Sequence, residues 1–193
     1  WNAILTSFYQ RTGRLDVLIN NAGILISGNF ESNPLARHHA LVDVNITGLL
    51  NGCYLSLAYL RKTSGARVIN LSSSSAIYGQ ASLATYSATK FAVRGLTEAL
   101  NIEWQKYGIS VVDIMPLFVQ TKMVTNMDAR SIKVFGAKLT AEDVARTIWR
   151  AATQHQRFNK VHWPVGMMST LLLRLTGLTP AWLNRLIVKH ITT

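Results

Sequence analysis

The chain has 193 residues, of which 49% are hydrophobic, and this composition excludes a disordered chain. Its single cysteine, Cys53, excludes an internal disulfide. The net charge of +11 at pH 7 does not indicate a nucleic-acid partner, because the basic residues are scattered along the chain without a dense Lys/Arg run.

The first predicted elements are a helix over residues 1–12 and a strand over Leu15–Asn20. The strand is a continuous apolar run with Val and Ile, which is typical of a strand covered on both faces. Such a central strand needs a neighbour on each side, but further strands are predicted only after it. We therefore expect part of the sheet to be missing. Asn21-Ala22-Gly23 predicts a tight turn at the carboxyl end of the strand, where open α/β sheets bind ligands; an ordinary turn is the alternative.

A long helix is predicted over residues 34–62, and it contains two poor helix formers. Asn45 and Gly48 indicate either a local kink in the helix or a functional role for the Asn45 side chain. A tolerated surface Asn is the alternative. The next strand, Ala66–Ser72, runs into Ser72-Ser73-Ser74-Ser75. A hydroxyl at this strand end can hydrogen-bond a carbonyl oxygen and stabilise developing negative charge, although a serine run is also typical of a polar loop.

The second long helix, Leu83–Tyr107, carries Tyr86 and Lys90 near its start. Residues four positions apart share a face of a helix, so an ammonium group is expected beside a phenol. The positive charge favours the phenolate, and we expect it to lower the pKa of Tyr86 toward neutrality, where a tyrosine can donate and accept protons. An exposed Tyr/Lys pair is the alternative. The strand Ile109–Met115 follows and ends at Pro116.

The last third of the chain begins with a helix from an N-cap at Thr140 to about Thr153, followed by a weak strand over Lys160–Trp163. Residues 164–193 form an apolar, basic tail that is predicted to be helical, and Thr179-Pro180 is typical of a helix start. No acidic residue follows Asp143. Apolar residues after Pro180 fall largely on one face, and they are Trp182, Leu183, Leu186, Ile187 and Ile191. This face can dock on the protein itself, on a subunit or on a membrane surface.

Several motifs, taken in order, resemble those of the classical short-chain dehydrogenase/reductase family. They are Asn20-Asn21-Ala22-Gly23, the mid-helix Asn45, Ser73, Tyr86 with Lys90, and Pro116-Leu117-Phe118-Val119-Gln120-Thr121, which matches the family's Pro-Gly-x-Val-x-Thr. Ser73 precedes Tyr86 by thirteen residues, the family's usual separation, and this selects it from the serine run. The resemblance covers most of residues 1–155.

The resemblance implies a role for each matched residue. Tyr86 is the catalytic acid/base, and Lys90 lowers its pKa and binds the nicotinamide ribose. Ser73 holds the substrate carbonyl or hydroxyl, and Asn45 supports a water-mediated proton relay to Lys90. The residues implied to contact the cofactor are Asn21, Ala22, Gly23, Tyr86, Lys90, Pro116, Val119 and Thr121. No metal is implied.

The resemblance and the alternation of strands and helices predict one partial domain over residues 1–193. Its fold class is α/β, a three-layer α/β/α Rossmann-type parallel sheet that lacks the first βαβ units. Residues 122–139 take the place of the family's substrate-covering loop. The apolar side chains of this segment favour an apolar pocket, and they are Met123, Val124, Met127, Val134 and Phe135. A poorly ordered surface loop is the alternative.

Two departures from the family pattern stand out. Leu117 replaces the usual Gly, and Leu would be strained there if the position needs a positive φ. The Gly-rich phosphate loop and the residue that selects NAD or NADP have no counterpart in the sequence, so the cofactor is predicted as NAD or NADP without a preference. We expect the isolated chain to bind this cofactor poorly.

The predicted function is NAD(P)-dependent interconversion of a secondary alcohol and a ketone, with a lipophilic substrate. The alternatives are a non-catalytic Rossmann-like binding or scaffold protein and an isomerase or dehydratase of the same fold. The predicted partners are the small-molecule alcohol or ketone and further copies of the chain in a homodimer or homotetramer, without nucleic acid. We expect a cytoplasmic protein, and peripheral membrane contact through the tail is an open alternative.

Overall fold

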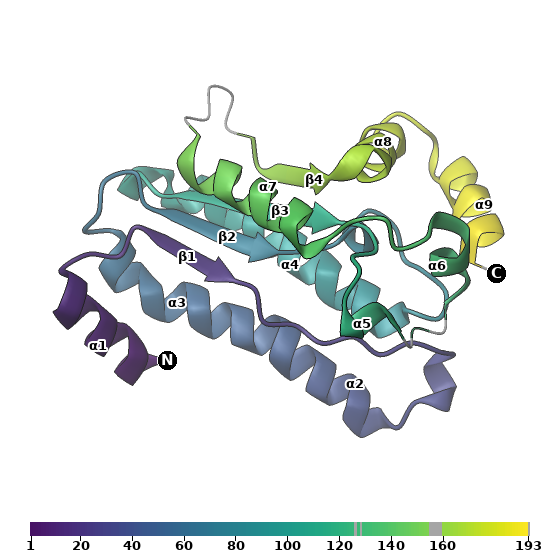
Figure 1. Ribbon diagram of the computed structural model, residues 1–193, viewed down its shortest axis with the longest axis horizontal. Helices are drawn as coiled ribbons and strands as arrows, with labels where there is room; N and C mark the ends of the chain where they lie inside the picture. Colours follow the sequence, from purple (N-terminus) through teal and green to yellow (C-terminus); the bar gives the residue numbers. More distant parts are fainter. Residues whose placement is uncertain (126, 128, 155–159, 193) are drawn as a thin grey trace.

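The computed structural model describes residues 1–125, 127, 129–154 and 160–192, which form four parallel strands with helices on both faces (Figure 1). The strands lie side by side in chain order, and they are β1 (Val17–Asn20), β2 (Arg67–Leu71), β3 (Ser110–Pro116) and β4 (His162–Val165). Leu18 lies opposite Val68, and Val68 lies opposite Val111. Parallel neighbours need crossover connections, so the order of the strands confirms the predicted α/β fold.

Alternation along the strands divides the core into two clusters. On one face, Leu18, Val68 and Val111 pack with side chains of α3 (Gly48–Leu60) and α4 (Ala84–Glu103). On the other face, Ile69, Val112 and Ile114 pack against α7 (Ala141–Thr153). Because both faces are covered by helices, the strands are continuous apolar runs.

The long helix predicted over residues 34–62 consists of three segments. They are α2 (Leu35–Val42), a π-helix (Asp43–Thr47) and α3. The π-helix places Asn45 in a widened turn, which confirms the predicted irregularity at that residue. Within the described residues, the stretch Leu35–Leu60 is long and apolar enough to cross a membrane by length and composition alone. It contacts β1, β2 and α4, as expected for a core helix of an α/β protein.

The ends of the other helices follow the predicted signals. α1 (Asn2–Thr12) ends at Gly13, which has a φ of 69°. α4 continues through a 3-10 turn (Trp104–Tyr107) to Gly108. At the start of α7, Thr140 and Asp143 form a capping box, in which each side chain accepts a hydrogen bond from the backbone N–H of the other residue.

The segment between β3 and α7 contains two short helices, α5 (Lys122–Thr125) and α6 (Arg130–Phe135). Asn126 and Asp128, which belong to the predicted substrate loop, lie outside the described residues. The tail forms α8 (Gly166–Thr176) and α9 (Ala181–Thr192), and α9 packs against α6 (Figure 1). The residues of the predicted apolar face of α9 are not all buried, and three of them, Trp182, Leu186 and Ile187, are exposed.

One strand prediction needs correction. β4 begins two residues later than predicted, because it pairs with residues Asp113–Pro116 of β3. β1 pairs only with β2 within the described residues, as expected from the prediction that further strands lie on one side of it and that part of the sheet is missing. Ile19 on this edge is accordingly 45% exposed.

Candidate functional site

The carboxyl ends of β1, β2 and β3 border a cavity with a volume of about 350 Å³. Most of the predicted site residues line it, and they are Asn21, Gly23, Ser73, Tyr86, Lys90, Pro116, Val119 and Thr121. Ala22 and Asn45 line a neighbouring cavity of about 230 Å³, which shares Asn21 and Lys90 with the first. The structure therefore brings all the predicted residues to two adjoining cavities at one edge of the sheet.

Ser73 is held where β2 ends. It caps a short 3-10 helix (Ser74–Ala76), and its Oγ accepts a hydrogen bond of 3.1 Å from the backbone N–H of Ser75. The same hydroxyl donates a hydrogen bond of 3.4 Å to the carbonyl oxygen of Pro116, and its interaction with Tyr86 acts to lower the pKa of the phenol. Ser73 and Tyr86 thus face each other across the cavity that both residues line.

Burial controls the acidity of Tyr86. It raises the pKa of the phenol to about 12, while the hydrogen bond from Ser73 favours the phenolate and acts in the opposite direction. The expected lowering toward neutrality is therefore wrong for this arrangement, because desolvation of the phenolate outweighs its stabilisation. At neutral pH Tyr86 keeps its proton and is a proton donor.

Lys90 lies one helical turn after Tyr86 and is buried. Its Nζ donates a hydrogen bond of 2.7 Å to the carbonyl oxygen of Leu71 and stands 5.5 Å from the centre of the Tyr86 ring. Burial lowers the pKa of Lys90 to about 8. The ammonium form still predominates at pH 7, so the site carries a positive charge next to the phenol.

The side chain of Asn45 joins the turn after β1 to α4. Its Oδ1 accepts a hydrogen bond of 2.8 Å from the N–H of Ile24, and its Nδ2 donates to the carbonyl oxygen of Ile24 and to Thr89 Oγ1, at 3.0 and 3.1 Å. A Cβ atom at Gly23 would stand 3.4 Å from Asn45 Oδ1 and 3.7 Å from Lys90 Nζ. Glycine thus leaves the space beside both polar groups open.

The loop after β3 forms another wall of the cavity. Leu117 does not have a positive φ, so the strain considered for this departure from the family pattern is absent. The backbone N–H of Gln120 donates a hydrogen bond of 2.8 Å to the carbonyl oxygen of Leu139, and Val119 forms a parallel bridge with the same residue. The loop is therefore fixed to the segment that precedes α7.

The predicted apolar lining is found in part. Met123, Val124 and Met127 line the cavity, together with Val144 and Ile148 of α7, which the sequence argument did not select. Val134 was also expected there, but it is 53% exposed. Phe135 does not contribute to the described lining either.

Gln80 is a cavity-lining residue that the sequence argument missed. It is buried, its Nε2 donates a hydrogen bond of 2.8 Å to Ser75 Oγ, and its Oε1 accepts one of 2.8 Å from Ser131 Oγ of α6. Gln80 therefore links the serine turn to the segment over the cavity. Its position in a loop between two predicted elements gave no pattern from which this role could be predicted.

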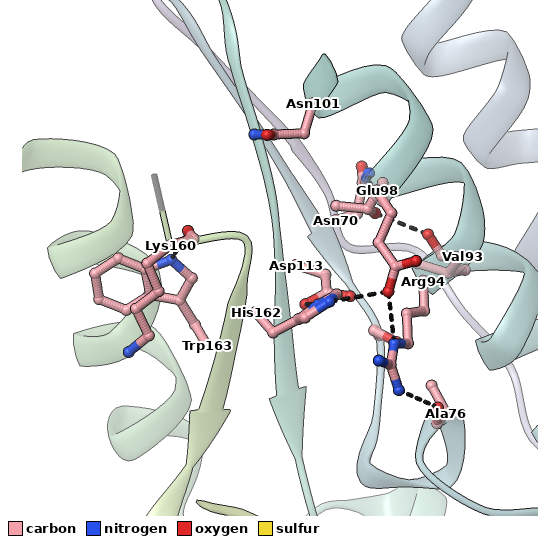
Figure 2. A network of polar contacts seen from close by, with 12 residues as sticks. Asn70, Ala76, Val93, Arg94, Glu98, Asn101, Asp113, Lys160, His162 and Trp163 are labelled. Atoms are coloured by element: carbon pink, nitrogen blue, oxygen red, sulfur yellow. Dashed lines mark hydrogen bonds and ion pairs between the residues drawn. The ribbon is translucent and has the colours of Figure 1, made fainter. Parts of the chain in front are cut away.

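A second polar cluster that was not predicted extends from β3 to the serine turn (Figure 2). His162 Nδ1 is 2.9 Å from Asp113 Oδ1, and its Nε2 is 3.0 Å from Glu98 Oε1. Arg94 Nε donates to Glu98 Oε1 at 2.8 Å, and Arg94 Nη1 donates to the carbonyl oxygen of Ala76 at 3.2 Å. Ala76 ends the 3-10 helix that Ser73 caps, so the hydrogen bond from Arg94 connects this cluster to the serine turn.

The pKa values of the acid and the imidazole in this cluster are both raised. Burial raises the pKa of Asp113, whose Oδ2 has no hydrogen-bond partner. The hydrogen bond with Asp113 raises the pKa of His162, because both ring nitrogens face carboxylate oxygens and the doubly protonated ring can donate to both. Among the residues that the structure describes, no group of three or more His, Cys, Asp or Glu side chains is arranged to hold a metal ion.

The profile of the short chain dehydrogenase family matches residues 1–131. This match covers more than half of the sequence, so the chain belongs to the short-chain dehydrogenase family. Family membership agrees with the fold and with the arrangement of Ser73, Tyr86 and Lys90.

Curated relatives include two enzymes named for steroid substrates. A 3-alpha-(or 20-beta)-hydroxysteroid dehydrogenase of Mycobacterium bovis is 37% identical over 123 residues, which cover 64% of this chain and 47% of that protein. A 3alpha-hydroxysteroid dehydrogenase of Mediterraneibacter gnavus is 34% identical over 131 residues, which cover 68% of this chain and 52% of that protein. The chain spans about half the length of these two relatives.

Solved structures show the same fold. ElxO with NADP bound is 28% identical, with a TM-score of 0.76 over 85% of this chain and 71% of that chain. A 3-ketoacyl-(acyl-carrier-protein) reductase from Brucella melitensis, complexed with NADH, has a TM-score of 0.78 at 24% identity and the same two coverages. These similarities confirm the Rossmann-type α/β fold.

Proposed function

We propose that this protein is an NAD(P)-dependent oxidoreductase that interconverts a secondary alcohol and a ketone. The observation that carries the proposal is that Ser73, Tyr86 and Lys90 line one cavity, with Lys90 Nζ 5.5 Å from the centre of the Tyr86 ring. A hydroxyl, a phenol and an ammonium group are together suited to polarise and protonate a carbonyl oxygen. Membership of the short-chain dehydrogenase family supports the same activity.

In the direction of ketone reduction, Tyr86 gives its proton to the substrate oxygen, and Ser73 donates a hydrogen bond to that oxygen. The hydride that completes the alcohol comes from the nicotinamide cofactor when it is bound. Lys90 places its positive charge next to the tyrosinate that remains. The raised pKa of Tyr86 favours its role as an acid at neutral pH, and alcohol oxidation, which needs the phenolate as a base, is expected to be favoured at higher pH.

The residues at the two cavities fit a nicotinamide cofactor. Gly23 leaves open the space beside Asn45 Oδ1 and Lys90 Nζ, so a ribose or a carboxamide can approach the backbone and these polar groups closely. We propose that Asn21, Ala22, Gly23 and Lys90 contact the cofactor from one side. The other side is assigned to the loop after β3, through Pro116, Val119 and Thr121. NAD and NADP are both compatible with these residues.

We propose a lipophilic substrate for this site. Apolar side chains of the 122–139 segment and of α7 line the cavity, and they include Met123, Val124, Met127, Val144 and Ile148. The two relatives named for hydroxysteroids support the same substrate class, because a steroid is a bulky apolar alcohol or ketone. A homodimer or homotetramer and a cytoplasmic location complete the proposal.

The test is a turnover assay with reduced nicotinamide and a series of ketones of increasing apolar area. We expect net consumption of NADH or NADPH and a rise in kcat/KM with apolar area. Turnover confined to small polar ketones would contradict the lipophilic substrate. Conversion of substrate without net consumption of cofactor would indicate an isomerase or dehydratase instead.

A further inference from the structure

Exposed apolar residues recur along α8, the turn that follows it and α9, and Met168 and Ile187 are exposed beside those selected here. The selected residues, called the tail surface, are Met167, Leu171, Leu175, Leu178, Trp182 and Leu186. Met167 is 86% exposed, Leu178 83% and Trp182 65%. A spacing of four residues places successive members on the same side of each helix. The tail surface is therefore systematic and not a scatter of single exposed side chains.

The sides of these helices that face the protein are also partly apolar. Leu172 and Leu173 of α8 and Leu183 and Val188 of α9 are half-buried. A helix that packs on a water-soluble domain normally presents polar residues on its outer side. A helix with apolar residues on both sides indicates a second apolar partner for the outer side.

The charge around the tail surface has one sign. No Asp or Glu follows Asp143, whereas seven Lys and Arg residues do. Arg174 is exposed three residues after Leu171, and Arg185 is exposed three residues after Trp182, so each cation shares a helix side with an apolar member of the tail surface. The partner that fits this surface is apolar and bears negative charge.

We propose that the tail surface docks the protein on an anionic membrane surface. The apolar side chains enter the upper acyl region, and Arg174 and Arg185 lie at the lipid headgroups. Trp182 suits this depth, because an indole ring is apolar with one polar N–H group. A two-fold contact with a second copy suits the surface less well, because it would bring the same cations together without a carboxylate from the tail to pair with them.

The position of α9 relates this surface to the cavity. α9 packs against α6, and α6 belongs to the 122–139 segment that also supplies Met123, Val124 and Met127 to the cavity lining (Figure 1). Docking would hold this segment next to the membrane, from which a lipophilic substrate could enter. The docking itself does not rest on the proposed reaction, since it is measured without cofactor or substrate.

The test is flotation of the purified protein with vesicles of phosphatidylcholine alone or with a quarter of phosphatidylserine. We expect the protein to float with the anionic vesicles, and we expect added salt to release it. The variants Trp182→Ser and Arg185→Glu should each lower the bound fraction about tenfold. Ile102→Ser and Lys106→Glu, at exposed positions at the end of α4 and in the 3-10 turn that follows it, are matched controls outside the tail that should bind like the parent.

The assay also has clear contrary outcomes. Equal binding of the parent and of the Trp182 and Arg185 variants would overturn the proposal, as would the absence of binding to both kinds of vesicle. If sedimentation showed that Trp182→Ser abolishes self-association and leaves vesicle binding unchanged, the tail surface would be assigned to a second copy. Circular dichroism of each variant separates these results from loss of folding.

Discussion

Two polar clusters lie along α4, and they differ in how their charges are balanced. In the first turns of the helix, Lys90 donates to the neutral carbonyl oxygen of Leu71 beside an open cavity. Further along the same helix, Arg94 pairs with Glu98, and Glu98 with His162 (Figure 2). One cluster is a cation bound to a neutral acceptor, and the other is a set of alternating charges.

The difference indicates which cluster serves chemistry and which serves folding. A buried ammonium group without a carboxylate partner is costly to the folded state, and such a group in a cleft is a candidate for function. The alternating charges of the second cluster join β3, β4 and α4 and need no ligand to be balanced. The predictions below test this division.

The largest effect is expected at the reacting oxygen. Tyr86→Phe removes the proton donor and should lower turnover of a ketone by at least about a hundredfold, while the protein stays folded. Tyr54→Phe, at an 80% exposed position on α3, is the matched control and should leave turnover unchanged. The measurement is the steady-state rate of each variant, with circular dichroism as the check on folding. If Tyr86→Phe kept the turnover of the parent, the first cluster would not supply the proton donor of the reaction.

The next effect is the pH dependence of stability that Lys90 introduces. Burial lowers its pKa from 10.5 to about 8, so between these values the unfolded chain binds more protons than the folded chain. The free energy of unfolding should therefore rise with pH over this window, by up to about 3 kcal/mol.

Lys90→Met should abolish this rise. Urea unfolding of both proteins at about pH 8 and about pH 10 measures it. The raised pKa values of Cys53, Tyr78 and Tyr86 act in the opposite direction in this range, but they act in parent and variant alike, so the difference between the two proteins isolates Lys90. The same rise in the variant and in the parent would show that Lys90 is not a buried, uncompensated cation.

A smaller effect is expected in the alternating cluster. His162→Gln removes a charged donor from Asp113 and should lower the free energy of unfolding by about 2 kcal/mol at about pH 6. The pKa of His162 is raised above 6.5 in the folded state, so its contribution is complete below that value and is lost as the pH rises through the raised pKa. The difference between variant and parent should shrink in alkaline solution, and a constant difference would contradict the assigned protonation.

The smallest effect is expected from a pair outside both clusters. Arg146 pairs with Asp143 at 3.0 Å on the surface of α7, where its side chain is 75% exposed. Arg146→Ala should change the free energy of unfolding by less than about 0.5 kcal/mol, because water screens the pair. If Arg146→Ala lowered the free energy of unfolding as much as His162→Gln, lower solvent exposure would not explain why the second cluster contributes more than a surface pair.

Local signals in the sequence marked the elements that carry Ser73, Tyr86 and Lys90, and the resemblance to the family selected these three residues. The strand that precedes Ser73 and the helix that carries the other two are both marked by strong apolar patterns. The capping box at Thr140 and the irregular turn at Asn45 were likewise predictable, because each depends on neighbours within a few residues.

Other features depend on contacts between segments that are distant in the sequence, and local sequence patterns do not predict those contacts. The pairing of Asp113 with His162 follows from the register of β3 and β4, which also moved β4 by two residues. The pKa of Tyr86 depends on how much water the surrounding elements exclude, so the charge of Lys90 alone gave the wrong direction.

The π-helix around Asn45 takes up one extra residue within an otherwise continuous helix. Because the wider turn absorbs this residue locally, the α-helical segments on either side keep their phase. Upstream of it, His38 makes a contact of 2.7 Å between its Nδ1 and Thr85 Oγ1, at the start of α4. Removing one residue from Asp43–Thr47 would restore regular winding, and we expect the contact between His38 and Thr85 to persist. The widened turn that carries Asn45 would be lost, so such a deletion would separate the placement of Asn45 from the anchoring of α4.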